Sequence, residues 1–188
     1  APTNVKDYSA YVNPFIGTGG HGHTFPGAVV PHGMIQPSPD TRIDGWDACS
    51  GYYYADSTIN GFSHTHVSGT GCCDYGDVLL MPTVGKQQYR TTDPQSQRLA
   101  YASSFSHKNE IAEPGYYSVF LDTYQVKAEI SSTKRGAIHR YTFPENAESG
   151  FIIDLDYSLQ RQTNSEMEIE VISDTEICGH KKTTYWAF

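Results

Sequence analysis

Val126-Lys127-Ala128-Glu129-Ile130-Ser131 alternates apolar and polar side chains over its whole length. A period of two is typical of a β-strand that has one face on a core and the other in water, because successive side chains point to opposite faces. An amphipathic helix would instead repeat its apolar residues every three or four positions. We therefore predict a half-buried strand at this place.

Short runs of the same kind lie on both sides of this strand. The turn-forming sequences Glu113-Pro114-Gly115 and Lys134-Arg135-Gly136 separate it from its neighbours. Strands at such regular spacing predict an all-β fold, an antiparallel β-sandwich of the supersandwich-like kind. The run at 150–155 is the most continuously apolar, and we expect it to be a central strand. The runs interpreted as strands span residues 116–122, 126–131, 137–143, 150–155, 167–171, 176–178 and 183–188.

The first half of the chain has a different character. Residues 11–77 are crowded with glycine, proline, histidine and tyrosine and show no sustained period, so we expect long Gly/His-rich loops there. We expect residues 1–188 to form one β-sandwich domain. The end of the chain, Tyr185-Trp186-Ala187-Phe188, is strongly apolar, whereas free chain ends are normally polar. We therefore expect the polypeptide to continue, with this domain as its N-terminal part.

Charge and hydropathy exclude two classes of partner. Lysine and arginine number 13 against 21 aspartate and glutamate residues, a formal net charge of −8, so we expect no nucleic-acid partner. No apolar run approaches the ~18 residues of a membrane span. The first residues, Ala1-Pro2-Thr3-Asn4, lack the basic and apolar regions of a signal peptide. They fit either a mature end left after signal cleavage or a trimmed end.

The segment 61–74 is the richest in chemistry. It places His64 and His66 one residue apart, followed by a Ser/Gly/Thr turn, an adjacent cysteine pair and Asp74. Folding alone rarely demands so many polar, metal-capable and conformationally special residues together. We interpret the segment as part of a functional site.

A metal site is one interpretation of His64 and His66. His21 and His23 repeat the spacing of the first pair, and two such pairs, completed by Cys49, Cys72 or Asp74, are one way to build a zinc site. The spacing is generic, and buried histidines bonded to the backbone are the alternative, so we assign no metal ligand in this chain. The four cysteines form no C-x-x-C pair, and we expect free, half-buried thiols.

The sequence around Trp46 indicates a carbohydrate ligand. It stands between Asp44-Gly45 and Asp47, in a turn that would hold an indole out from the scaffold. A displayed ring that stacks on the C–H face of a pyranose, beside carboxylates that bond its hydroxyls, is a common way to bind carbohydrate. Core packing of Trp46 is the alternative. Glycoside hydrolysis also needs two carboxyl groups at a defined separation, but the spacing of the acids marks none of them as catalytic.

These motifs together resemble the start of glycoside hydrolase family 92, the bacterial exo-acting α-mannosidases. The resemblance is specific over about residues 11–84 and rests on a compatible strand pattern beyond. It is carried by residues 12–19, 21–28, 31–34, 38–40, 45–47, 50–52, 59–66, 68–71 and 74–77.

The resemblance implies a two-domain enzyme that acts on mannose-containing glycans, including the degradation of N-glycans. It implies calcium dependence, inversion of configuration, and a larger C-terminal (α/α)₆ barrel that carries the general acid, the general base and most calcium ligands. This chain lacks that barrel, so we expect it to hold no catalytic residue and to be inactive alone. Its implied role is to form one wall of the substrate pocket. The candidate substrate-binding residues are Gly19, His21, Trp46, Asp47, His64 and His66.

Two other readings stay open from the residues alone. One is a stand-alone carbohydrate-binding module without catalytic activity, favoured by the tyrosine and tryptophan content. The other is a His/Cys metalloprotein. The family resemblance also implies a periplasmic or extracellular location. The preferred mannosidic linkage depends on contacts made by the missing barrel.

Overall fold

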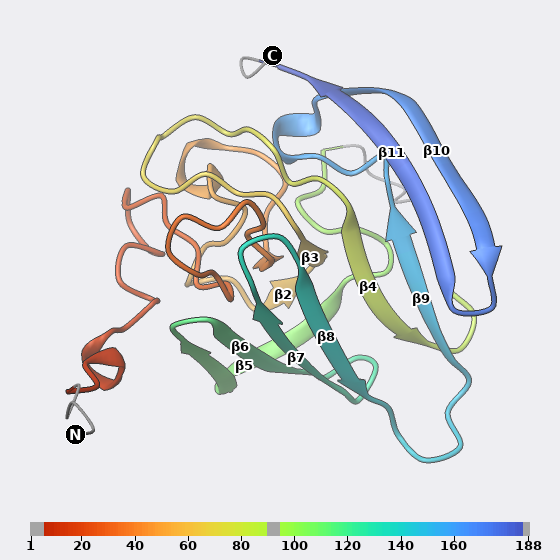
Figure 1. The fold of residues 1–188 in the computed structure, drawn as a ribbon, viewed down its shortest axis with the longest axis horizontal. Coiled ribbons are helices and arrows are strands. Elements are labelled where there is room, and N and C mark those ends of the chain that lie inside the picture. Colours follow the sequence, from red (N-terminus) through yellow and green to blue (C-terminus); the bar gives the residue numbers. More distant parts are fainter. Residues whose placement is uncertain (1–5, 90–94, 186–188) are drawn as a thin grey trace, which may run out of the picture.

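The computed structural model describes residues 6–89 and 95–185. Three antiparallel sheets make up the fold, and the prediction of an all-β sandwich is confirmed (Figure 1). The four-stranded sheet has the order β1-β3-β4-β9, the five-stranded sheet the order β2-β5-β6-β7-β8, and β10 pairs with β11 alone. The strands are β1 (Ser38–Asp40), β2 (Thr58–Ile59), β3 (Gly61–Ser63), β4 (Leu79–Val84), β5 (Ser103–Glu113), β6 (Tyr116–Leu121), β7 (Val126–Ser132), β8 (Ala137–Thr142), β9 (Ser149–Asp154), β10 (Thr163–Ser173) and β11 (Glu176–Thr184).

The alternating strand of the sequence is β7. Val126, Ala128 and Ile130 are completely buried, as its period of two predicts. In the register with β6 they lie opposite Leu121, Val119 and Tyr117, which are also buried. Each fully buried aliphatic side chain contributes roughly 1.5–3 kcal/mol relative to exposure. This pair of strands therefore supplies much of the core.

The two larger sheets meet through aromatic rings. Phe62 of β3 is completely buried, and its ring centroid lies 6.4 Å from that of Tyr117 on β6 and 6.3 Å from that of Tyr141 on β8. Offset and edge-on contacts at such distances stabilise a core beyond the area they bury. The short strand β3 is thereby fixed between the sheets. The segment 61–74, which β3 begins, starts from this rigid point.

One strand prediction is wrong in its position. β9 lies at the edge of its sheet, beside β4 only, and not at the centre. Its apolar run has a different cause, because Ile153 and Leu155 line a cavity of about 190 Å³ together with Ile169 and Ile177 of the β10–β11 ribbon. The strand is therefore apolar although it has a strand neighbour on one edge only.

The remaining boundaries mostly agree with the sequence reading. The separate strands expected at 176–178 and 183–188 are one strand, β11, and residues 186–188 lie outside the described residues. β5 was not expected, and it is among the longest strands. The irregular segments 12–37 and 41–57 lie on the side of the molecule opposite the β10–β11 ribbon (Figure 1). The segment 64–78 reaches the ribbon, where Asp77 accepts a hydrogen bond from Thr183 and pairs with Lys181 of β11. The expected long N-terminal loops are therefore present, and they hold the candidate site.

Candidate functional site

Trp46 is displayed as the sequence predicted. It begins the short 3-10 helix η2 (Trp46–Ala48), which follows Gly45 at a φ of 103°, and it is 62% exposed. A positive φ is readily adopted by glycine, which turns the chain sharply here. The indole therefore stands out from the scaffold and is available to a ligand or to another domain.

The glycine-rich loop 17–23 meets this turn through a side-chain hydrogen bond. His21 Nδ1 lies 2.5 Å from Asp47 Oδ1; the His21 side chain is exposed and that of Asp47 is half-buried. The loop is also held by a backbone hydrogen bond, in which the Tyr54 N–H donates to the carbonyl of Thr18 at 3.0 Å. Gly19, another candidate, belongs to the same loop. The structure therefore brings His21, Trp46 and Asp47 together, while their contact with substrate stays a prediction.

His23, which the sequence reading left out of the substrate site, completes this cluster. Its ring stands edge-on to Trp46, with centroids 4.8 Å apart at 85°, and the residue is only 8% exposed. Gly71 makes room for both rings, because a Cβ on it would come within 2.9 Å of the indole and 3.1 Å of His23 Nδ1. Three segments, 19–23, 45–47 and 69–72, thus meet around Trp46.

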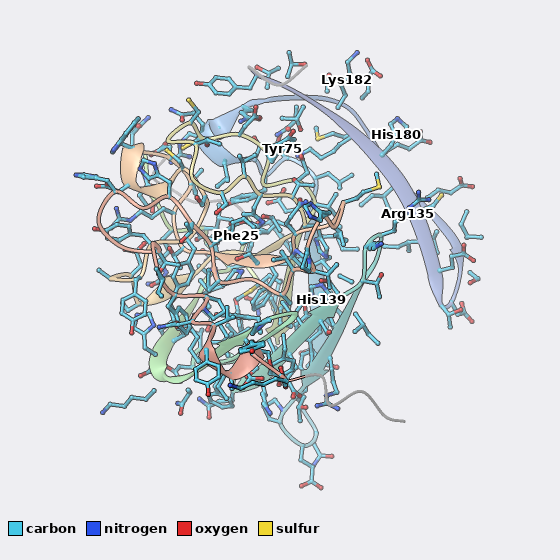
Figure 2. All side chains as sticks on the ribbon, turned by 60° about the vertical axis from the view of Figure 1, so that its left-hand side comes forward. Phe25, Tyr75, Arg135, His139, His180 and Lys182 are labelled. Carbon is cyan, nitrogen blue, oxygen red and sulfur yellow. The ribbon has the colours of Figure 1, made fainter. Side chains whose placement is uncertain are left out.

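His64 belongs to a different network, which joins the two large sheets. Its Nδ1–H donates to the Val78 carbonyl at 2.7 Å, so its Nε2 accepts a hydrogen bond from His139 Nε2–H at 3.1 Å. His139 Nδ1 in turn accepts from the Tyr141 hydroxyl at 2.8 Å. This chain of hydrogen bonds satisfies two neutral imidazoles. Figure 2 shows His139 on the strands of the five-stranded sheet.

Burial explains why both imidazoles are neutral. Desolvation lowers the pKa of His64, against the opposing effect of the Val78 carbonyl. Desolvation, with a smaller contribution from His64, lowers the pKa of His139 to about 4. The charged form is disfavoured because little water reaches these rings.

His66 is fully buried, and its placement differs from that of a side chain on a pocket wall. Its Nδ1–H donates to the Gln36 carbonyl at 2.7 Å, and its Nε2 lies 2.8 Å from Asp40 Oδ1. Neither side chain has any exposed surface. In this structure His66 supports the loops from beneath. A direct contact of His66 with sugar remains untested, as does that of His64.

Three of the four cysteines lie beside the same tryptophan. Cys49, Cys72 and Cys73 line a cavity of about 360 Å³ with Trp46, and all four cysteines of the chain are free thiols. Desolvation, together with the neighbouring Cys49, raises the pKa of Cys73 to about 12. A thiol that stays protonated is a poor nucleophile. Cys49 and Cys73 are buried, whereas Cys72 and Cys178 are exposed.

The calcium that the family resemblance implies does not fit the cluster around Trp46. His21, His23 and Asp47 offer two imidazole nitrogens and one carboxylate. Calcium prefers six to eight oxygen ligands. Among the described residues no other group of three or more such side chains is close enough to hold a metal ion.

Sequence reasoning missed two parts of this arrangement, His23 against Trp46 and His139 against His64. A signal existed for the first, since His23 shares the spacing of His21. No signal existed for the second, because residues 75 positions apart meet only once the sheets pack. No helix within residues 6–89 and 95–185 is long and apolar enough to cross a membrane.

Known proteins carry the same domain. The model of the glycosyl hydrolase family 92 N-terminal domain matches residues 11–187. A family GH92 α-mannosidase of Bacteroides thetaiotaomicron, solved with mannoimidazole, is 42% identical with a TM-score of 0.87, over 93% of this chain and 23% of that one. A family GH92 inverting mannosidase of Bacteroides thetaiotaomicron VPI-5482 is 32% identical with a TM-score of 0.69, over 88% of this chain and 22% of that one.

A curated relative agrees with these structures. An uncharacterized secreted glycosidase of Arthroderma benhamiae is 32% identical over 143 residues, which are 74% of this chain and 18% of the relative. The chain thus spans less than a quarter of the length of these three proteins. By its sequence over residues 11–187 and by its fold, the chain belongs to glycosyl hydrolase family 92, as the N-terminal domain of that family.

Proposed function

We propose that this chain is the N-terminal domain of a calcium-dependent, inverting exo-α-mannosidase that acts on mannose-containing glycans such as N-glycans. Its role is to form one wall of the substrate pocket. The observation that carries the proposal is the cluster in which an indole 62% exposed lies beside the His21–Asp47 pair. The likeness to family GH92 mannosidases supports the substrate class.

The cluster suits a sugar for physical reasons. The face of Trp46 offers a flat apolar surface for the C–H groups of a pyranose. Asp47 and His21 offer an acceptor and a donor for its hydroxyls, and their mutual hydrogen bond fixes both side chains. Fixed groups that hold a substrate in position lower the barrier by removing the entropy cost of orientation.

The chemical step belongs to the C-terminal barrel that we propose follows this domain. In an inverting glycosidase one carboxylic acid protonates the leaving oxygen, while a carboxylate activates a water molecule on the opposite face of the sugar. Calcium bound in that barrel would supply a positive charge for the sugar's hydroxyls. The residues of this chain bind and orient the substrate. The similarity to a secreted glycosidase supports a periplasmic or extracellular location.

The test uses the full-length enzyme with its barrel. Trp46→Ala removes the stacking surface, and we expect kcat/KM on α-mannosides to fall by about 10–100-fold, equivalent to roughly 1.4–2.7 kcal/mol of binding to the transition state. Tyr89→Ala is the matched control, because Tyr89 is 70% exposed but is not part of the cluster. Equal kinetics for Trp46→Ala and the wild type would contradict the proposal.

The isolated chain separates the proposal from a carbohydrate-binding module. We expect it to release no mannose from α-mannosides, with or without calcium, because half a pocket lacks the acid and base. We also expect it to bind mannosides no more tightly than millimolar in calorimetry. Tighter binding would favour the binding module, and calcium-dependent hydrolysis would place catalytic residues in this chain.

A further inference from the structure

Three metal-capable side chains converge on the outer side of the Trp46 turn. His21, His23 and Asp47 each offer one ligand atom, and these atoms all lie within 4.8 Å of one another. His21 and Asp47 are already in contact at 2.5 Å. Ligand atoms around one ion about 2.0–2.2 Å away lie roughly 3–4 Å apart. Small side-chain rotations therefore suffice to bring all three onto one ion.

A second observation points to a ligand here. His23 is more than nine-tenths buried, yet its Nε2 is buried without a hydrogen-bond partner among the described residues. Leaving a buried polar nitrogen unsatisfied costs roughly 1–3 kcal/mol, so such groups usually have a partner. His21, only two residues away, is by contrast largely exposed. A buried imidazole beside an exposed one is suited to hold an ion at the surface while excluding water from one side.

The donor set selects the class of ion. Two imidazoles and one carboxylate suit zinc and its transition-metal neighbours, and zinc sites with three protein ligands leave a fourth position open. We propose that His21, His23 and Asp47 bind one divalent ion of the zinc class. This goes beyond the proposed mannosidase function, because the calcium of that function requires oxygen ligands and lies elsewhere.

The bound ion would fix the position of the tryptophan. Asp47 follows Trp46 directly, and the His23 ring packs edge-on against the indole. An ion bonded to all three ligands ties the loop 19–23 to the turn 45–47 more firmly than one hydrogen bond does. Solvent would reach the open coordination position from the side of His21, whose side chain is 76% exposed.

Zinc binding tests the proposal without any sugar or enzyme assay. The chain is stripped with a chelator and titrated with zinc against a chromophoric indicator, and the bound metal is counted by mass spectrometry. We expect one zinc ion per chain with a dissociation constant below roughly 10 µM. His21→Ala and Asp47→Asn should each weaken binding by about 10-fold or more. Both side chains reach solvent, so these variants keep the buried contacts, and circular dichroism checks their fold.

His180→Ala is the matched control. His180 is an exposed histidine with a carboxylate, Glu168, 3.8 Å away, and it lies on the outer β10–β11 ribbon (Figure 2). This substitution should leave zinc affinity unchanged. No stoichiometric zinc, equal affinity in His21→Ala and Asp47→Asn, or loss of binding in His180→Ala instead would each overturn the proposal.

Fluorescence locates the ion. Trp46 and Trp186 are the two tryptophans of the chain, so in a Trp186→Phe background the emission reports on Trp46. Copper(II), which binds the same ligands and quenches nearby indoles, should quench this emission at one equivalent, because His23 contacts the indole ring. The quenching should require His21 and Asp47. Quenching that persists in both variants would place the copper elsewhere and reject the site.

Discussion

His66 Nε2 and Asp40 Oδ1 lie 2.8 Å apart, and neither side chain has any exposed surface. The other nitrogen of His66 donates to the carbonyl of Gln36. The Gln36 carbonyl can only accept, so His66 Nδ1 carries a proton; the contact of Nε2 with Oδ1 then needs one further proton, on either the imidazole or the carboxyl group. The pair joins the end of β1 to the segment that follows β3, and so supports the candidate site from within.

Asp40→Ala should destabilise the chain strongly. Removing one partner of a buried pair typically costs about 3–5 kcal/mol in the free energy of unfolding. Here it would leave His66 Nε2 with the Ser63 hydroxyl, 3.1 Å away, in place of the carboxyl group. Asp40→Asn should cost less, because its amide N–H can donate to Nε2 of a neutral His66. Urea denaturation of the three proteins measures the differences. If Asp40→Ala unfolds within 1 kcal/mol of the wild type, the pair does not have this role.

Gly51→Ala should be destabilising for a steric reason. A Cβ at this position would lie 2.0 Å from Asp40 Oδ1 and 3.2 Å from His66 Nε2, at a φ of +81°. We expect a loss of more than about 3 kcal/mol in the free energy of unfolding. Gly85→Ala is the control, since Gly85 has a similar φ of +73° but open space around it. That substitution should cost only about 1 kcal/mol, the backbone penalty alone. Equal losses for the two would refute the steric argument.

Glu110→Gln should weaken the core of the five-stranded sheet. The Glu110 carboxylate has no exposed surface and accepts hydrogen bonds from the hydroxyls of Tyr52 and Tyr117 and from His107 Nδ1–H. Glutamine removes the negative charge and leaves the three partners one acceptor oxygen in place of two, so we expect a loss of about 2–4 kcal/mol. The exposed pair of Glu166 with Lys182 supplies the control. Glu166→Gln should change the free energy of unfolding by less than about 0.5 kcal/mol.

The His64–His139 pair should make stability depend on pH. The pKa of His139 is lowered from 6.5 to about 4 in the folded chain. Between these values the unfolded chain binds a proton that the folded chain rejects, so stability is present above pH 6.5 and is lost as the pH falls toward 4. We expect a loss of about 2 kcal/mol, allowing for the partial exposure of the ring.

His139→Gln provides the comparison for this pH dependence. Its amide can donate to His64 and accept from Tyr141, but it does not titrate. Unfolding free energies of both proteins, measured from pH 7.5 to pH 4, should diverge below pH 6.5, with the flatter curve for the variant. Parallel curves would mean that His139 does not contribute.

The sequence was most informative where a local period decides structure. The alternation of Val126, Ala128 and Ile130 predicted β7 and its buried face, because strand periodicity depends only on neighbouring residues. The displayed Trp46 was also foreseeable, since Gly45 and the flanking acids indicate a turn. Whether a strand lies at the edge or at the centre of its sheet could not be predicted. β9 is apolar because it packs against the β10–β11 ribbon, although it is an edge strand.

Contacts between distant segments explain the rest of the site. His21 and Asp47 are 26 positions apart, and so are Asp40 and His66. Nothing in either local sequence identifies the partner, so His66 resembled His64 in the sequence although it is buried with Asp40. The sequence identified His21, Trp46 and Asp47 as candidate residues. It did not predict which of them contact one another, because that depends on how the loops fold.

The pairing of β4 with β9 also sets an order of events during folding. Val84 and Ser149 are register partners, and β5, β6, β7 and β8 lie between them in the chain. Closing so long a loop before the intervening strands have formed is entropically unfavourable, whereas the hairpins β6–β7 and β7–β8 close over a few residues. We therefore expect β6–β8 to form first and to bring β4 and β9 together afterwards.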